Sequence, residues 1–176
     1  NGLKVIDILH NDINGSSNQY YITKKNSKFK INKLKIKKVL NAEKRIKLHS
    51  KKTIISLFKK VHQIKKNLVK LIRNIKEKNE TIHGYGASTK GNVLLQYFGI
   101  TNKELDFIAE RNPKKYNLYT PGTKIKIISE KMSRKKKPHY YLVLPWHFKK
   151  EILVREKKVR SMGTKFIFPL PDIKIF

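Results

Sequence analysis

Apolar and polar residues alternate in the first forty residues of the chain, as they do in β-strands. The alternation covers residues 3–8 and 18–23, on either side of an Asn-Gly-Ser-Ser turn sequence at 14–17, and it predicts two paired strands joined by a turn. Two strands with so few apolar residues do not fold alone. We therefore expect residues 1–40 to belong to a larger sheet.

A long helical pattern follows between residues 41 and 79, where the sequence has neither proline nor glycine. Apolar residues recur there every three or four positions from Ile54 to Ile75, which predicts one apolar stripe along a helix of several turns. Lysine fills the opposite face. A basic amphipathic helix could lie on a membrane or in a partner's groove, but we favour packing against the protein's own sheet.

From residue 80 onward, strand patterns alternate with helical ones. A short strand precedes a glycine-rich loop and a helical pattern, and a second helix is predicted at 148–154. Further strands are predicted at 105–109, 124–128, 140–144 and 165–168. This alternation predicts an α/β fold, a Rossmann-like parallel sheet with flanking helices. Ligands bind beyond the carboxyl ends of the strands in such sheets, which here are residues 84–91, 110–112 and 145–147.

The glycine-rich loop is the most informative of these segments. A short apolar lead ends in two glycines, then hydroxyl groups and a lysine open a helix, an order typical of a phosphate cradle. Ser88 or Thr89 could cap the helix or donate to phosphate. The spacing matches neither standard motif, because Thr89 replaces the third glycine of G-x-G-x-x-G and Lys90 precedes Gly91. A tight glycine turn without a ligand is the alternative.

The charge of the chain is strongly positive. Lys and Arg number 42 against 12 Asp and Glu, a formal net charge of +30, which favours nucleic acid as a partner. Few of the cations are arginine, however, and the lysines are spread along the chain together with abundant asparagine and isoleucine, as an AT-rich coding sequence would produce. We therefore favour drift on solvated surfaces and keep a basic nucleic-acid-binding module as the rival function.

Other features of the composition exclude several classes. The chain has no cysteine, which excludes disulfides and thiolate metal sites and favours the cytoplasm. No apolar stretch is long enough to span a membrane. The histidines show no metal-ligand spacing, so no metal is expected. Because the chain begins at Asn1 rather than methionine, we expect a fragment or a processed product.

Five sequence blocks stand in a set order across nearly a hundred residues. They are residues 85–92, 110–115, 119–123, 144–152 and 163–171. Together they resemble the C-terminal domain of the C-methyltransferases that modify nucleotide-linked deoxysugars. Residues 2–7 and 14–17 resemble the last strands of that family's middle domain. The family usually has Asp in place of Glu110, Asn in place of His147 and Gly in place of Ser16.

The resemblance implies an enzyme that transfers a methyl group from S-adenosylmethionine to a keto-deoxysugar carried on a nucleotide, which we expect to be dTDP. It implies that residues 1–40 are the last part of the S-adenosylmethionine domain and that residues 80–176 form the substrate-side domain. Residues 41–79 would be a helical connector between the two. The catalytic residues, most of the S-adenosylmethionine site and a zinc site would lie in the remainder of the enzyme, the chain's expected partner. A separately encoded subunit or a decayed remnant is the alternative, and we expect this chain to be inactive alone.

The resemblance also places the substrate contacts. The candidate residues are Tyr85, Gly86, Ala87, Ser88, Thr89, Lys90, Gly91, Asn92, Glu110, Arg111, Asn112, Pro121, Gly122, Thr123, Trp146 and His147. Among them, contacts to the nucleotide or its pyrophosphate are expected from Tyr85, Ser88, Lys90 and Asn92. Thr123 and Trp146 are expected near the substrate, and Glu110 could accept from a ribose or sugar hydroxyl. The alternative for each residue is a role in packing, capping or surface charge.

Overall fold

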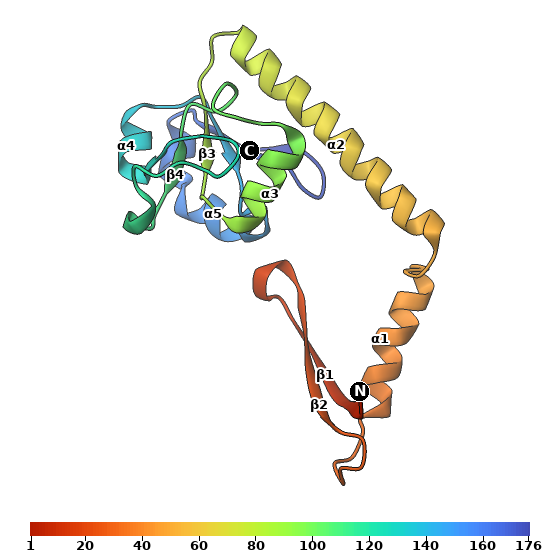
Figure 1. The fold of residues 1–176 in the computed structure, drawn as a ribbon. Helices are drawn as coiled ribbons and strands as arrows, with labels where there is room; N and C mark the ends of the chain where they lie inside the picture. The colour runs from red at the N-terminus through yellow and green to blue at the C-terminus, as the bar shows by residue number, and fades with distance from the viewer. The chain divides into compact units, whose positions relative to one another are not determined.

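The computed structural model describes residues 1–176 and divides into two compact units, residues 1–60 and 61–176 (Figure 1). The first unit begins with β1 (Leu3–Asn11), which pairs antiparallel with β2 (Ser17–Lys24). A single 3-10 turn, η1 (Ile13–Gly15), joins them, with Asn14 and Gly15 at left-handed φ values of 54° and 86°. Asn-Gly suits such a turn because both residues tolerate positive φ. The predicted strand pair is confirmed.

The single helical pattern predicted from residue 41 is in fact two helices. They are α1 (Lys33–Arg45) and α2 (Lys51–Glu77). Helix α1 starts early because the Asn32 side chain caps it, accepting from the Lys35 backbone N–H at 3.2 Å. The break follows Arg45, and Lys47 adopts a left-handed φ of 51° within it. No proline or glycine marks this break, so the composition carried no signal for it.

The second unit is built on a six-stranded sheet with the order β5-β4-β3-β6-β7-β8. The strands are β3 (Ile82–Tyr85), β4 (Ile108–Glu110), β5 (Ile127–Ser129), β6 (Tyr140–Val143), β7 (Lys165–Phe168) and β8 (Lys174–Ile175). The first five are parallel, and β8 adds antiparallel to β7. The predicted Rossmann-like α/β fold is confirmed. Strand β8 was not predicted, because two residues are too few to show a strand pattern.

Four helices connect the strands. They are α3 (Thr89–Phe98), α4 (Glu130–Lys135), α5 (Lys149–Arg155) and α6 (Lys157–Ser161), with 3-10 turns η2 (Pro113–Lys115) and η3 (Trp146–Phe148). Figure 1 shows α3 and α4 on opposite sides of β3 and β4. None of the helices in the structure combines the length and the apolar character that crossing a bilayer requires.

Two apolar clusters cover the two faces of this sheet. The α2 stripe enters the larger one through Ile64, Leu68, Ile72 and Ile75, which confirms that this part of the helix packs on the protein's own sheet. The smaller cluster, on the other face, contains Tyr85, Tyr141, Phe166, Phe168 and Ile152. Because the chain moves outward from β3 through β4 and β5 and then crosses back to β6, the carboxyl ends of β3 and β6 form the crevice where Rossmann-like folds bind ligands.

One histidine is buried beneath this crevice. His83 is 2% exposed, its Nδ1 lies 2.8 Å from Ser133 Oγ, and Ser133 Oγ lies 2.8 Å from the Tyr141 hydroxyl. Burial lowers the pKa of His83 to about 4. The imidazole is therefore neutral near pH 7 and forms part of the packed core.

We expect this histidine to make the second unit acid-sensitive. The unfolded chain binds a proton at His83 near pH 6.5, whereas the folded chain does so only near pH 4, so stability present above pH 6.5 is lost as the pH falls through this window, by about 3 kcal/mol. Urea unfolding followed by the fluorescence of the single tryptophan, Trp146, measures this. His83→Gln should flatten the pH dependence, and the exposed His62→Gln should not. Parallel curves for His83→Gln and the unaltered chain would contradict the assignment.

Candidate functional site

The structure brings together the three loops predicted to meet at the carboxyl edge of the sheet. Gly86 follows β3 and donates its backbone N–H to Ala109 O of β4 at 2.8 Å, and Leu144, just after β6, donates to Tyr85 O at 3.0 Å. These bonds continue the parallel ladders on both sides of β3. The glycine-rich loop is therefore anchored between β4 and β6.

Three glycines, Gly84 in β3, Gly86 in the loop and Gly91 in α3, allow close packing between parts of the protein. A Cβ on Gly84 would lie 2.8 Å from Ile108 Cγ1, and one on Gly86, whose φ is +81°, would lie 2.8 Å from Pro145 Cδ. A Cβ on Gly91 would collide with Leu144 Cβ, so this glycine lets α3 pack closely on the end of β6. The space beside each glycine is filled by another part of the chain, and the backbone of the loop is approached by protein there.

Ser88 is the N-cap of α3. Its Oγ accepts from the Gly91 backbone N–H at 3.0 Å, and its φ and ψ are those of an extended residue. The cap role weighed for this serine is the one the structure shows. Thr89 and Lys90, the next two residues, are exposed in the first turn of α3.

Glu110 ties the glycine-rich loop to the loop after β4. Its carboxylate accepts from the backbone N–H of Ala87 at 2.8 Å, of Arg111 at 2.8 Å and of Asn112 at 2.9 Å. Lys115 Nζ lies 3.8 Å from the same carboxylate and donates to Ala87 O at 2.8 Å. The side chain expected to accept from a sugar hydroxyl therefore braces the loops of the site.

Two cavities lie on either side of the glycine-rich loop. The α3-side cavity, of about 300 Å³, is lined by Ala87, Ser88, Thr89, Asn92, Leu95, Ile108, Lys115, Thr120, Pro121, Ile127 and Leu144. The α5-side cavity, of about 360 Å³, is lined by Tyr85, Gly86, Ala87, Ser88, Glu110, Arg111, Lys115, Glu130, Pro145, Phe148, Glu151, Ile152 and Arg155. Both touch the loop and Lys115, so a cation lies where they meet.

Two predicted site residues carry buried polar atoms that have no partner within the protein. They are Asn92 Oδ1 and His147 Nδ1. Burial, with the charge of Lys90 as a second cause, lowers the pKa of His147, so this imidazole is neutral near pH 7. Buried polar atoms are almost always hydrogen-bonded in proteins. Asp106 and Arg160 also carry such an atom, and of these four residues only Asn92 lines either cavity.

Tyr85 is placed in the core, with its hydroxyl in a network of charges. Its ring is 2% exposed and meets those of Tyr141 and Phe166 edge to face. The hydroxyl donates to Glu156 Oε1 at 2.8 Å and accepts from Arg155. Burial raises the pKa of this hydroxyl. Tyr85 touches the α5-side cavity, but its polar atom is already bonded to the protein.

The same network contains cavity residues that were not predicted from the sequence. Arg155 Nη2 lies 3.2 Å from Glu130 Oε1, and both residues line the α5-side cavity. Glu130 and Arg155 stand far from Tyr85 in the sequence, and no local pattern relates the three. Lys115, by contrast, lies in the sequence block 110–115, so its place at the site could have been predicted from the sequence.

The remaining predicted residues on the loop after β4 have structural partners. Asn112 caps η2 by accepting from the Lys114 backbone N–H at 3.1 Å, and Arg111 O accepts from Tyr116 at 3.0 Å. Arg111 and Asn112 are both exposed. They stand at the edge of the site, with Arg111 lining the α5-side cavity.

The turn at 120–123 presents a different threonine from the one expected. Thr123 is buried, and its hydroxyl lies 2.6 Å from that of Thr120. Thr120 and Pro121 line the α3-side cavity, whereas Thr123 lines neither cavity, and Gly122 has a φ of +75°. Trp146 is half-buried and packs against both apolar clusters.

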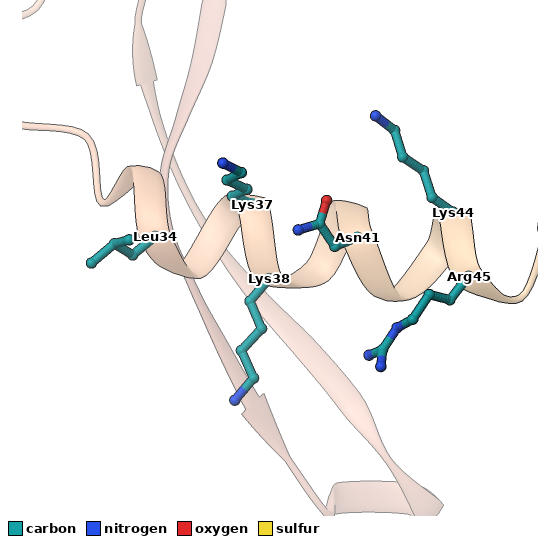
Figure 2. Close-up of a pocket in the computed structure, with 6 residues that line it drawn as sticks. All are labelled: Leu34, Lys37, Lys38, Asn41, Lys44 and Arg45. Atoms are coloured by element: carbon teal, nitrogen blue, oxygen red, sulfur yellow. The ribbon is translucent and has the colours of Figure 1, made fainter.

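A separate hollow of about 680 Å³ lies on α1 and is lined by Leu34, Lys37, Lys38, Asn41, Lys44 and Arg45. Figure 2 shows Lys37 and Lys44 extending to one side of the helix and Lys38 and Arg45 to the other. These cations do not converge on one point, so the hollow lacks the geometry of a small-ligand site. No group of three His, Cys, Asp or Glu side chains in the structure could hold a metal ion.

The second unit is an α/β domain whose sheet has a crevice at its topological switch point. The chain belongs to the C-methyltransferase C-terminal domain family, whose model matches residues 12–171. It is 32% identical over 113 residues to the C-methyltransferase NovU of Streptomyces niveus. This alignment covers 64% of the chain and 27% of the relative, so the chain corresponds to only part of that enzyme. The resemblance noted in the sequence is confirmed.

We expect Glu110→Gln to loosen the glycine-rich loop. An amide offers one acceptor oxygen in place of two, so the change removes an acceptor from the backbone N–H groups that Glu110 holds, and the free energy of unfolding should fall by about 1–3 kcal/mol. Urea unfolding followed by Trp146 fluorescence measures the loss, and hydrogen exchange at Ala87 and Asn112 should accelerate. The exposed Glu77→Gln is the matched control. Unchanged exchange at both amides would contradict the bracing role.

Proposed function

We propose that this chain is the substrate-side part of an S-adenosylmethionine-dependent C-methyltransferase that acts on a keto-deoxysugar linked to a nucleotide, with dTDP as the carrier. Membership of the C-methyltransferase C-terminal domain family over residues 12–171 carries the proposal. The crevice at the switch point supports it, because this is the position where α/β sheets bind nucleotides.

The proposed reaction methylates the sugar carbon beside a ketone. A base removes the acidic proton on that carbon, the oxygen of the resulting enolate needs electrostatic support, and the carbanion displaces the methyl group from the sulfonium donor. We assign the base and most of the S-adenosylmethionine site to the remainder of the enzyme, together with any zinc. This chain then acts by holding the substrate in position.

The predicted substrate residues divide into two groups on this proposal. Asn92 and His147 offer unpartnered polar atoms, and Thr89, Lys90, Arg111 and Pro121 lie exposed around the crevice. In contrast, Glu110, Ser88 and Gly91 shape the loop, and Tyr85 and Thr123 hold the core beneath it. We assign ligand contact to the first group and positioning to the second.

The divisions proposed for the chain follow from the same family resemblance. Residues 1–40 would be the last part of the S-adenosylmethionine domain, and residues 80–176 would form the substrate-side domain. Residues 41–79 would be the helical connector between them. The exposed Leu3, Tyr20 and Ile22 of the strand pair support a covering partner, which we propose to be the rest of the methyltransferase. We also propose a cytoplasmic location, in keeping with the proposed nucleotide-sugar substrate.

We expect dTDP to raise the melting temperature of the chain, and S-adenosylhomocysteine to leave it unchanged, because the nucleotide site is the one proposed to lie here. A thermal-shift comparison at two salt concentrations, with a short DNA duplex as a third ligand, makes the measurement. A ligand that binds only the folded state stabilises it by an amount that grows with the logarithm of its concentration relative to its Kd. Stabilisation by the duplex alone, with no response to dTDP at either salt concentration, would overturn the proposal.

That last outcome would favour the rival function, a basic nucleic-acid-binding module. Its support is the net charge of +30 and the cations that surround α1 (Figure 2). Binding through lysines alone releases counterions and weakens steeply with salt. The salt series therefore separates a general attraction for polyanions from a specific site for dTDP.

We also expect the isolated 176-residue chain to transfer no methyl group. The crevice contains substrate-holding side chains, while the base and the methyl-donor site are assigned elsewhere. Incubation with radiolabelled S-adenosylmethionine and a dTDP-linked keto sugar measures transfer, and a complete C-methyltransferase serves as the positive control. Labelled sugar formed by this chain alone would contradict the division of roles.

A further inference from the structure

We propose that the α3-side cavity is the nucleobase site, and that Asn92 recognises a ring N–H group of the base. This inference rests on the proposed function. It goes further by assigning a different part of the nucleotide to each cavity. The α5-side cavity and the junction at Lys115 would then receive the diphosphate and the sugar.

The walls of the α3-side cavity suit a flat apolar ring. Leu95, Ile108, Ile127 and Leu144 are each at most 5% exposed and line the cavity from α3 and from the strand ends. Pro121 stands at its rim. Such walls offer neither charge nor hydrogen bonds to a phosphate group or a sugar, whereas a heterocyclic base buries its faces against them.

Most polar side chains of this cavity already have partners within the protein. Ser88 Oγ accepts from Gly91 N–H, Thr120 Oγ1 accepts from Ile125 N–H at 2.9 Å, and Lys115 Nζ donates to Ala87 O. Asn92 Oδ1 is the buried exception. An unpaired acceptor requires a donor, and the ring N–H of a thymine or uracil base is a donor flanked by carbonyl groups that the same amide can reach with its NH₂.

The position of Lys115 indicates where the diphosphate end of the nucleotide would lie. Lys115 lines both cavities, and Arg111 and Arg155 line the α5-side cavity. The α5-side cavity is also lined by Glu110, Glu130 and Glu151, so it holds charged groups of both signs, in contrast to the apolar walls of the α3-side cavity. Phosphates are stabilised by cations, and Lys115 is the cation that both cavities share, so the base would enter the α3-side cavity with its phosphates toward Lys115.

Calorimetric titration with dTDP tests the role of Asn92. We expect Asn92→Ala to weaken dTDP binding about ten-fold, the scale of one lost hydrogen bond that leaves a buried group unpaired. Pyrophosphate, which has no base, should bind both proteins equally. Asn102→Ala, an exposed asparagine of the second unit, is the matched control and should bind dTDP as the unaltered chain does.

A second arm leaves the protein unchanged, so it does not depend on the variant folding. N3-methylthymidine diphosphate lacks the ring N–H, and we expect it to bind the unaltered chain about ten-fold more weakly than dTDP. It should bind Asn92→Ala no more weakly than dTDP does. Equal binding of the two nucleotides by the unaltered chain would overturn the inference and leave the proposed function standing. Absence of dTDP binding altogether would contradict the proposed function itself.

Discussion

The glycine-rich loop after β3 is held by contacts that leave no room for a side chain, and the rest of the site depends on this constraint. Gly84, in β3, lies against Ile108 of β4, and Gly86, in the loop, lies against Pro145 just after β6, so neither position has space for a side chain. Gly91 lets α3 pack on Leu144. Because these approaches fill the loop's own surface, the open space lies beside the loop, in the α3-side and α5-side cavities.

Hydrogen bonds from one carboxylate complete this arrangement. Glu110 accepts hydrogen bonds from three backbone N–H groups in two loops. Lys115, in the loop after β4, links the same two loops by donating to Ala87 O. Side chains whose polar atoms are satisfied in this way are already in position before a ligand arrives. Preorganisation of this kind lowers the ordering cost of binding, which suits a domain proposed to hold a substrate for chemistry performed by the remainder of an enzyme.

The strong positive charge has a smaller part in the site than its size suggests. Most of the net charge of +30 is carried by lysines, and those at α1 diverge rather than converge (Figure 2). Two of the cations at the crevice are paired with carboxylates: Lys115 with Glu110, and Arg155 with Glu130 and Glu156. The local balance of charge, with both signs within a few ångströms, therefore differs from that of the whole chain.

The sequence by itself determined the strand pair, the alternation of strands and helices, the three loops of the crevice and the family, because periodicity and ordered motifs are carried by neighbouring residues. It did not reveal the break after Arg45 or the short β8, which lack a local pattern. Only the tertiary structure decided that Glu110 braces loops, that Tyr85 belongs to the core, that Thr120 replaces Thr123 at the cavity and that Asn92 is left unpaired. Each of these depends on which distant residues come into contact, and burial and hydrogen bonding are settled only there.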